Sequence, residues 1–136
     1  SVNVLSRSDT LHCATVNEVR AQLGFDQITV YVDKRYRKGS CPYRSILDHE
    51  HEHVNIFRNA LAHYAPKVEA RLTEAAARLK PVSARSVNRA AEKLQKALHR
   101  KMKSMFKTIN ATMDANNARI DTVDNYKREQ ARCTTW

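Results

Sequence analysis

Residues 45–57, SILDHEHEHVNIF, alternate three histidines with two glutamates. Histidine nitrogens and carboxylate oxygens are common zinc ligands, so the spacing decides which of them could share an ion. On a helix, His49 and His53 lie about one turn apart on the same face, whereas on a strand His51 would join them on that face. The conformation of this stretch therefore decides which ligand set exists.

Apolar residues at helical spacing predict that this stretch is a helix. Leu47, Val54 and Leu61 recur at seven-residue intervals, and Phe57 and Tyr64 fall on the same stripe. We therefore expect an amphipathic helix from residue 43, capped by one of the serines that surround its start.

On this helix, residues 49–53 form an H-E-x-x-H motif. In such a motif both imidazoles reach one zinc ion, the zinc lowers the pKa of a bound water, and Glu50 removes its proton. His51 points about 200° away from His49 around the helix and cannot join the same ion. The alternative interpretation is a solvated helix face with favourable His–Glu contacts. A strand-like segment just upstream favours zinc, because zinc peptidases use such a strand to hold an extended substrate.

A catalytic zinc usually has three protein ligands and keeps one position for water. The sequence leaves the third ligand open among downstream acidic or amide side chains: Glu69, Glu74, Asp114, Asn117 and Asp121. The first two require the chain to fold back at Pro66. The last three require two long helices to form an antiparallel hairpin that turns at Pro81.

Two glycines and three prolines in 136 residues predict few, long elements. Residues 15–24 have the spacing of a short helix, and residues 28–32 alternate like a half-buried strand. Pro66 is expected to bend or break the H-E-x-x-H helix, and a helix of about thirty residues follows Pro81. We expect a mainly helical α+β fold, in which short strands pack on the H-E-x-x-H helix with a long antiparallel helical hairpin, a minimal zincin-like arrangement.

The length corresponds to about one domain. We expect a single domain over residues 1–136, with residues 1–42 as a helix and strand part and residues 43–136 as the zinc-site helix and the basic hairpin. A segment preceding Ser1 is expected to complete the sheet. The chain lacks an initial methionine and a leader-like sequence, which is typical of a processed protein whose signal peptide has been removed. No apolar run approaches the ~18 residues of a membrane span.

Positive charge is concentrated in one part of the chain. The net charge is +10, and residues 67–107 hold twelve Lys or Arg and three Glu, which gives +9. Such a surface could bind nucleic acid, anionic lipid or an acidic envelope polymer. Phe106 is the one aromatic residue in this stretch, so no platform for base stacking is visible. The alternative is a solvated basic face on a core helix.

Cys13, Cys41 and Cys133 lie too far apart for a C-x-x-C motif. One interpretation is three unpaired, buried thiols in a cytosolic protein. The other is a disulfide in a secreted protein, with one cysteine left over.

Two segments carry a wider pattern. In VYVDKRYRKGSCPYRSILDHEHEHVNIFRNAL, a strand-like run and a Gly-Ser-Cys-x-Tyr turn precede the H-E-x-x-H helix. In RIDTVDNYKREQARC, Asp121, Thr122 and Tyr126 are the matching positions. Over residues 28–65 and 117–133, the chain resembles a bacterial family of predicted secreted zinc-dependent proteases, known chiefly as a domain of unknown function.

The resemblance implies several properties that composition and spacing do not. It implies export to the periplasm or the medium, and a zinc site on the H-E-x-x-H motif with Glu50 as the base. It implies a functional role for the segment around Asp121. It also implies a disulfide between Cys41 and Cys133.

The leading hypothesis is therefore a secreted zinc-dependent metalloprotease that acts on a peptide or protein substrate. His49, His53 and Asp121 would hold Zn²⁺, and Glu50 would activate the attacking water. A nearby side chain would stabilise the oxyanion, and the candidates are Tyr126, Tyr64 and His63. The alternative is a basic helical module that binds an anionic polymer through residues 67–107 without catalysis. A purely structural zinc is disfavoured, because such sites usually have four Cys or His ligands.

Overall fold

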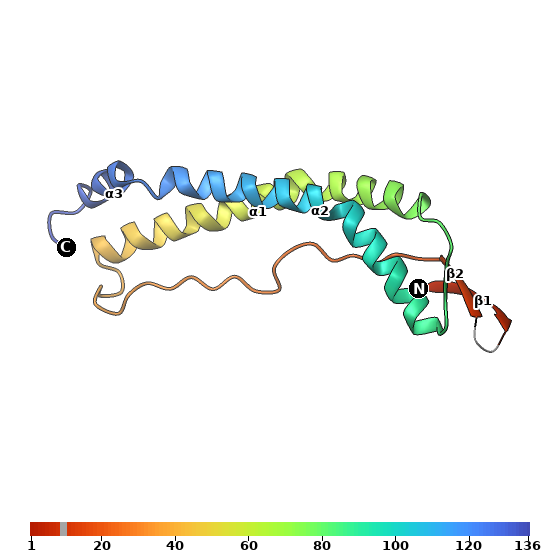
Figure 1. Cartoon of the computed structure of the whole chain (residues 1–136). Coiled ribbons are helices and arrows are strands. Elements are labelled where there is room, and N and C mark those ends of the chain that lie inside the picture. The colour runs from red at the N-terminus through yellow and green to blue at the C-terminus, as the bar shows by residue number, and fades with distance from the viewer. Residues whose placement is uncertain (9–10) are drawn as a thin grey trace. The chain divides into compact units, whose positions relative to one another are not determined.

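The computed structural model of the chain describes residues 1–8 and 11–136 (Figure 1). Its elements are, in chain order, β1 (Val2–Ser8), β2 (Leu11–Val16), α1 (Cys41–Ala77), β3 (Val82–Ala84), α2 (Val87–Ile120) and α3 (Val123–Gln130). Two long helices dominate the chain, and the three strands form one antiparallel sheet in the order β1-β2-β3. The expected mainly helical α+β fold is confirmed.

The chain divides into two compact units, each built from distant segments. The first unit comprises residues 1–23 and 64–108, and the second comprises residues 24–63 and 109–136. Each unit therefore contains one end of α1 and one end of α2. The single domain expected over residues 1–136 stays a prediction.

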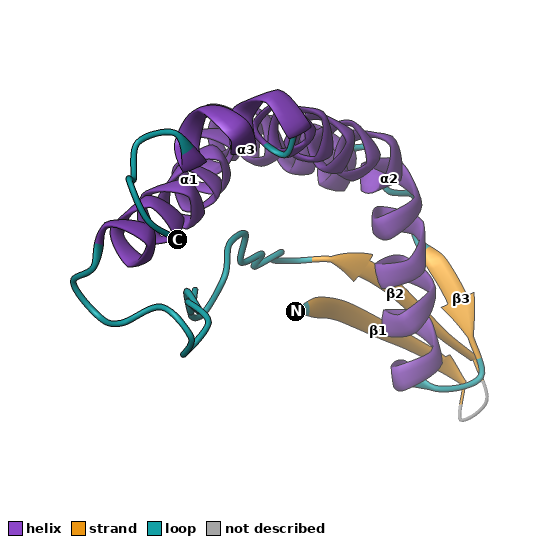
Figure 2. Ribbon diagram, turned by 90° about the vertical axis from the view of Figure 1, so that its left-hand side faces the viewer, coloured by secondary structure: helices purple, strands orange, loops and turns teal. Residues whose placement is uncertain are grey.

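The first unit contains the sheet, which one face of α2 covers (Figure 2). Ala14 of β2 pairs with Val4 of β1 and with Val82 of β3. The side chains on this face pack against Ala90 and Leu94 of α2 in a buried core. The alternation of apolar and polar residues in V-N-V and A-T-V produces this one-sided sheet, because successive side chains of a strand point to opposite faces.

The helix expected over residues 15–24 is wrong. Thr15 and Val16 are the last residues of β2, and the backbone N–H of Asn17 donates to Ser1 O at 3.3 Å. Val16 pairs with Val2 and packs against the core of the sheet. Cross-strand pairing and burial thus outweigh a weak helical periodicity, because propensity yields to tertiary context.

The strand expected at residues 28–32 is also wrong. These residues belong to the long loop between β2 and α1, and the Tyr31 side chain is 82% exposed. A strand needs a neighbouring strand that satisfies its backbone groups. In the part of the chain that the structure describes, all three strands belong to the first unit, so this segment of the second unit has no ladder to join.

Helix ends follow local hydrogen bonding. The N–H of Tyr43 donates to Ser40 Oγ at 3.3 Å, so Ser40 caps α1, and the N–H of Arg89 donates to Ser86 Oγ at 3.3 Å at the start of α2. The chain turns through Pro81, as expected. Of the bend or break expected at Pro66, the break is wrong, because α1 continues through Pro66 to Ala77. None of the helices in the described residues has both the length and the apolar composition for crossing a membrane.

In the second unit, a disulfide joins the first residue of α1 to the segment that follows α3. Cys41 and Cys133 are bonded with an Sγ–Sγ distance of 2.01 Å and lie 92 residues apart in sequence. This confirms the pairing that the resemblance implied and leaves Cys13 as a free thiol. The bond fixes the end of α3 beside the start of α1.

Replacing both bonded cysteines with serine should lower the free energy of unfolding by about 2–5 kcal/mol, because the bond closes a long loop in the unfolded chain. Urea titration followed by circular dichroism measures this change. Cys13→Ser is the matched control and should leave the midpoint nearly unchanged. Equal midpoints for the wild type and the double variant would contradict the stabilising role of the bond.

Candidate metal centre

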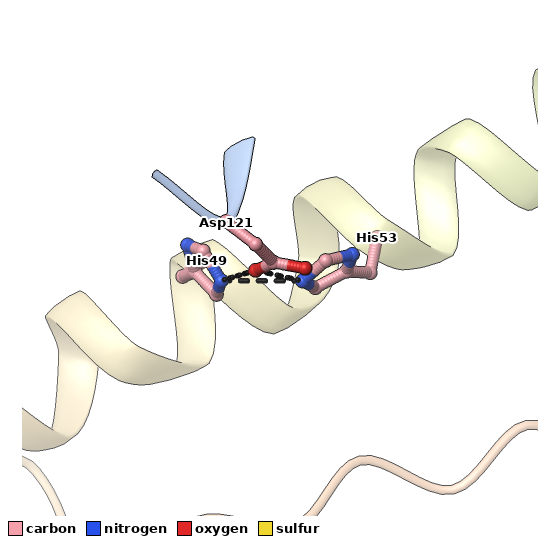
Figure 3. A group of neighbouring side chains, drawn as sticks. All are labelled: His49, His53 and Asp121. Atoms are coloured by element: carbon pink, nitrogen blue, oxygen red, sulfur yellow. Dashed lines mark hydrogen bonds and ion pairs between the residues drawn. The ribbon is translucent and has the colours of Figure 1, made fainter. Parts of the chain in front are cut away.

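The H-E-x-x-H residues lie on the part of α1 that belongs to the second unit. His49 and His53 share one face of this helix, and their Nε2 atoms are 3.2 Å apart. Asp121 directly follows the last residue of α2, and its Oδ1 lies 3.2 Å from each of the two Nε2 atoms (Figure 3). The structure thus brings together the three predicted ligands.

Of the other third-ligand candidates, Asn117 lies beside the group but contacts Nδ1 of His53 and not Nε2, and the remaining three lie elsewhere. Asp114 is exposed on α2, and Glu69 and Glu74 belong to the first unit, where Glu74 pairs with two arginines. Within residues 1–8 and 11–136, His49, His53 and Asp121 are the one group of three His, Cys, Asp or Glu side chains positioned to share an ion. Asp121 is therefore the best placed of the candidates.

A second layer of side chains orients both imidazoles. His49 Nδ1 lies 3.1 Å from Glu129 Oε1, and His53 Nδ1 lies 2.7 Å from Asn117 Oδ1. Because both partners are acceptor oxygens, each Nδ1 carries the hydrogen of the bond. In a neutral ring the Nε2 lone pair is then free to bind a metal. Such outer partners typically fix the tautomer and the ring orientation of metal-binding histidines.

Glu129 is a site residue that sequence reasoning missed. Its side chain is buried in α3, with 7% relative exposure, and its Oε1 also accepts from Asn125 Nδ2 at 2.8 Å. Thr122 caps α3 and accepts from the N–H of Asn125, which holds this turn in register. The only local signal was spacing: Asn125 and Glu129 are four residues apart and therefore share a helix face.

Tyr126 contacts the ligand group directly. Its hydroxyl donates to Asp121 Oδ1 at 2.8 Å, and its ring centroid lies 5.1 Å from that of His49. The hydrogen bond to Asp121, together with burial, raises the pKa of Tyr126 to about 12, so the hydroxyl stays a donor at neutral pH. Of the three oxyanion candidates, Tyr64 lies in the first unit, whereas Tyr126 is bonded to a predicted ligand.

The electrostatics of the group favour an ionised carboxylate. Burial alone would raise the pKa of Asp121, but the hydrogen bond from Tyr126 and the two histidines outweigh it and lower that pKa. Burial likewise disfavours the charged form of His49, yet the carboxylates of Glu129 and Asp121 prevail and raise the pKa of His49. Protons and a metal ion would therefore compete for the same nitrogen.

The donor set fits zinc. Zinc is bound by imidazole nitrogen and carboxylate oxygen at about 2.0–2.2 Å, and two such ligands in a tetrahedral site lie roughly 3.3 Å apart. The three separations of 3.2 Å between the donor atoms match that spacing. Two imidazoles and one carboxylate are three protein ligands, and a tetrahedral zinc with three protein ligands keeps its fourth position for water or substrate.

Glu50 lies beside His49 on the wall of a pocket of ≈ 220 Å³ that Tyr126 also lines. Its side chain is half-buried, and its carboxylate makes no hydrogen bond or ion pair with the part of the chain that the structure describes. The carboxylate is thus available to accept a proton from a group bound in this pocket.

Comparison with known proteins found no match: no protein-family model fits the chain, and no curated protein or solved structure is significantly similar to it. Any functional interpretation therefore rests on the geometry and chemistry of these residues.

Glu129→Gln should raise the dissociation constant for zinc about 10- to 100-fold, because loss of an outer partner commonly weakens metal binding by that factor. Competition with a chromophoric chelator measures this constant. Glu52→Gln, on the exposed part of the same helix as the histidines, is the control and should bind zinc like the wild type. Equal affinities for Glu129→Gln and Glu52→Gln would show that Glu129 does not orient His49.

Proposed function

We propose that the chain is a zinc-dependent hydrolase that cleaves peptide or amide bonds. The observation that carries this proposal is the convergence of His49 Nε2, His53 Nε2 and Asp121 Oδ1, each 3.2 Å from the others, beside the unpaired carboxylate of Glu50. The H-E-x-x-H spacing agrees with it.

Each residue has a defined task in this proposal. His49, His53 and Asp121 would hold Zn²⁺, which in such sites polarises the substrate carbonyl and lowers the pKa of water to about 7. Glu50 takes the proton of the attacking water and passes it to the leaving amine. Glu129 and Asn117 keep Nδ1 of each imidazole protonated and Nε2 turned toward Asp121.

Tyr126 is proposed to stabilise the oxyanion. Its hydroxyl donates to Asp121, and Tyr126 also lines the cavity beside Glu50, so the one O–H hydrogen would turn from Asp121 to the carbonyl oxygen of a bound substrate. A donor placed where negative charge develops on the carbonyl oxygen lowers the barrier for acyl transfer. The protonated state of this hydroxyl at neutral pH is a precondition for that role.

Export to the periplasm or the medium is part of the same proposal. The Cys41–Cys133 bond supports it, because disulfides persist mainly in oxidising compartments.

Two measurements test the proposed hydrolase. Elemental analysis should find about one zinc per chain in the wild type and much less in His53→Ala, because a structural or catalytic zinc needs three or more ligands. Hydrolysis of a quenched-fluorescent peptide library should fall at least about 100-fold in Glu50→Gln, which loses the general base but keeps zinc.

Glu52→Gln is the matched control for Glu50→Gln and should retain both zinc and activity. Hydrolysis at the wild-type rate by Glu50→Gln would be incompatible with the proposed mechanism. Zinc bound equally by the wild type and His53→Ala would place the metal elsewhere.

A second candidate function, binding of an anionic polymer, rests on a basic pocket in the first unit. A cavity of ≈ 390 Å³ is lined by Arg85, Arg89 and Lys93, and no carboxylate of residues 1–8 or 11–136 lines it. In the same stretch, Arg71 and Arg78 pair with Glu74, and Lys96 pairs with Glu92. The three pocket cations are thus the better placed to meet phosphate or sulfate groups.

Replacing Arg85, Arg89 and Lys93 with alanine should weaken binding to heparin and lower the slope of log affinity against log salt by about 2–3. A matched triple variant of the ion-paired residues Arg71, Arg78 and Lys96 removes the same charge and should have a smaller effect. Equal losses of heparin affinity in the two variants would mean that the protein binds heparin by non-specific charge attraction alone. A heparin affinity that does not depend on salt would exclude binding of an anionic polymer.

A further inference from the structure

A pocket of ≈ 220 Å³ adjoins His49 and Glu50 in the second unit. Its walls come from the start of α1, from α3 and from two aromatic side chains outside the helices, Tyr36 and Trp136. Pockets for whole small-molecule ligands are typically about 300–1,000 Å³. This volume therefore suits a single side chain that projects from a substrate lying across the metal centre.

The outer wall of the pocket is aromatic and held in place. The rings of Tyr36 and Trp136 meet edge to face, with centroids 6.0 Å apart. The indole Nε1 of Trp136 donates to Gln130 O at 2.7 Å, so its polar end is satisfied while 48% of the residue stays exposed. Ile46 and the ring of Tyr126 also line the cavity. Such surfaces gain most from contact with another aromatic or large apolar group.

The polar groups of Glu129 and Ser45, which line the pocket, already have hydrogen-bond partners within the protein. Glu129 accepts from His49 and Asn125, and Ser45 Oγ donates to Glu129 O at 3.4 Å. A positively charged occupant would lose its hydration and find the neutral polar groups of Tyr36, Tyr126 and Gln130, and Glu50, whose carboxylate the proposed reaction uses as a base. Burying an unpaired charge or polar group is costly, so an apolar occupant is favoured over a lysine or arginine side chain.

We propose that this pocket binds a large apolar or aromatic side chain of a peptide substrate, next to the scissile bond. That the bound molecule is a substrate rests on the proposed hydrolase function. The apolar or aromatic character of the bound side chain rests on the pocket alone. Tyr36 and Trp136 are then the residues that determine specificity.

Trp136 is the one tryptophan of the chain, so its fluorescence reports on this pocket without background from another indole. We would titrate the protein with the acetylated amides of phenylalanine, alanine and lysine. The phenylalanine compound should give a saturable change, and the other two should give none over the same range. Tyr36→Ala should weaken that response at least 10-fold, and Tyr31→Ala, which removes a tyrosine that is 82% exposed, should leave it unchanged.

Hydrolysis provides the second arm. Peptides with phenylalanine beside the scissile bond should have a kcat/KM at least about 10-fold above that of matched alanine peptides, and Tyr36→Ala should bring this ratio close to one. Equal cleavage of the two peptides, or a preference for lysine, would overturn the inference while the hydrolase stands. A phenylalanine response in a protein without zinc or hydrolysis would overturn the proposed function and confirm only the aromatic pocket.

Discussion

The second unit is organised around one buried contact, the hydrogen bond between His49 Nδ1 and Glu129 Oε1. A carboxylate and an imidazole are costly to bury unless each is paired, so α3 must remain against α1 for either to be stable there. The relative exposures of 6% for His49 and 7% for Glu129 show how completely both are covered. Orientation of the imidazole is therefore coupled to the packing of a helix eighty residues away.

Several independent features hold α3 in this position. The Cys41–Cys133 bond fixes its end, Thr122 caps its start, and the Tyr126 hydroxyl links its first turn to Asp121. α3 thus supplies Glu129, which bonds to His49, and Tyr126, which bonds to Asp121. Conditions that release α3, such as reduction of the disulfide, should therefore disturb the geometry of His49 and Asp121.

The local parts of this arrangement were predictable from sequence, and the non-local parts were not. The helical stripe around His49 follows from periodicity, and a hairpin that turns at Pro81 left Asp114, Asn117 and Asp121 as the nearest candidates for the third ligand. The pairing of β1 with β2, and the absence of a strand at residues 28–32, depend on which segments pair with each other. The alternation of apolar and polar residues alone does not determine this pairing. Glu129 could not be predicted as a site residue, because its contact with His49 forms only when α3 packs on α1.

In the proposed site, two imidazoles and one carboxylate hold zinc, and zinc-edge X-ray absorption of the zinc-loaded protein measures these ligands. The spectrum should show nitrogen and oxygen neighbours at about 2.0–2.2 Å, including two imidazoles, with one of these lost in His53→Ala. A sulfur neighbour at about 2.3 Å, which would implicate Cys13, or a spectrum unchanged in His53→Ala, would contradict this ligand set.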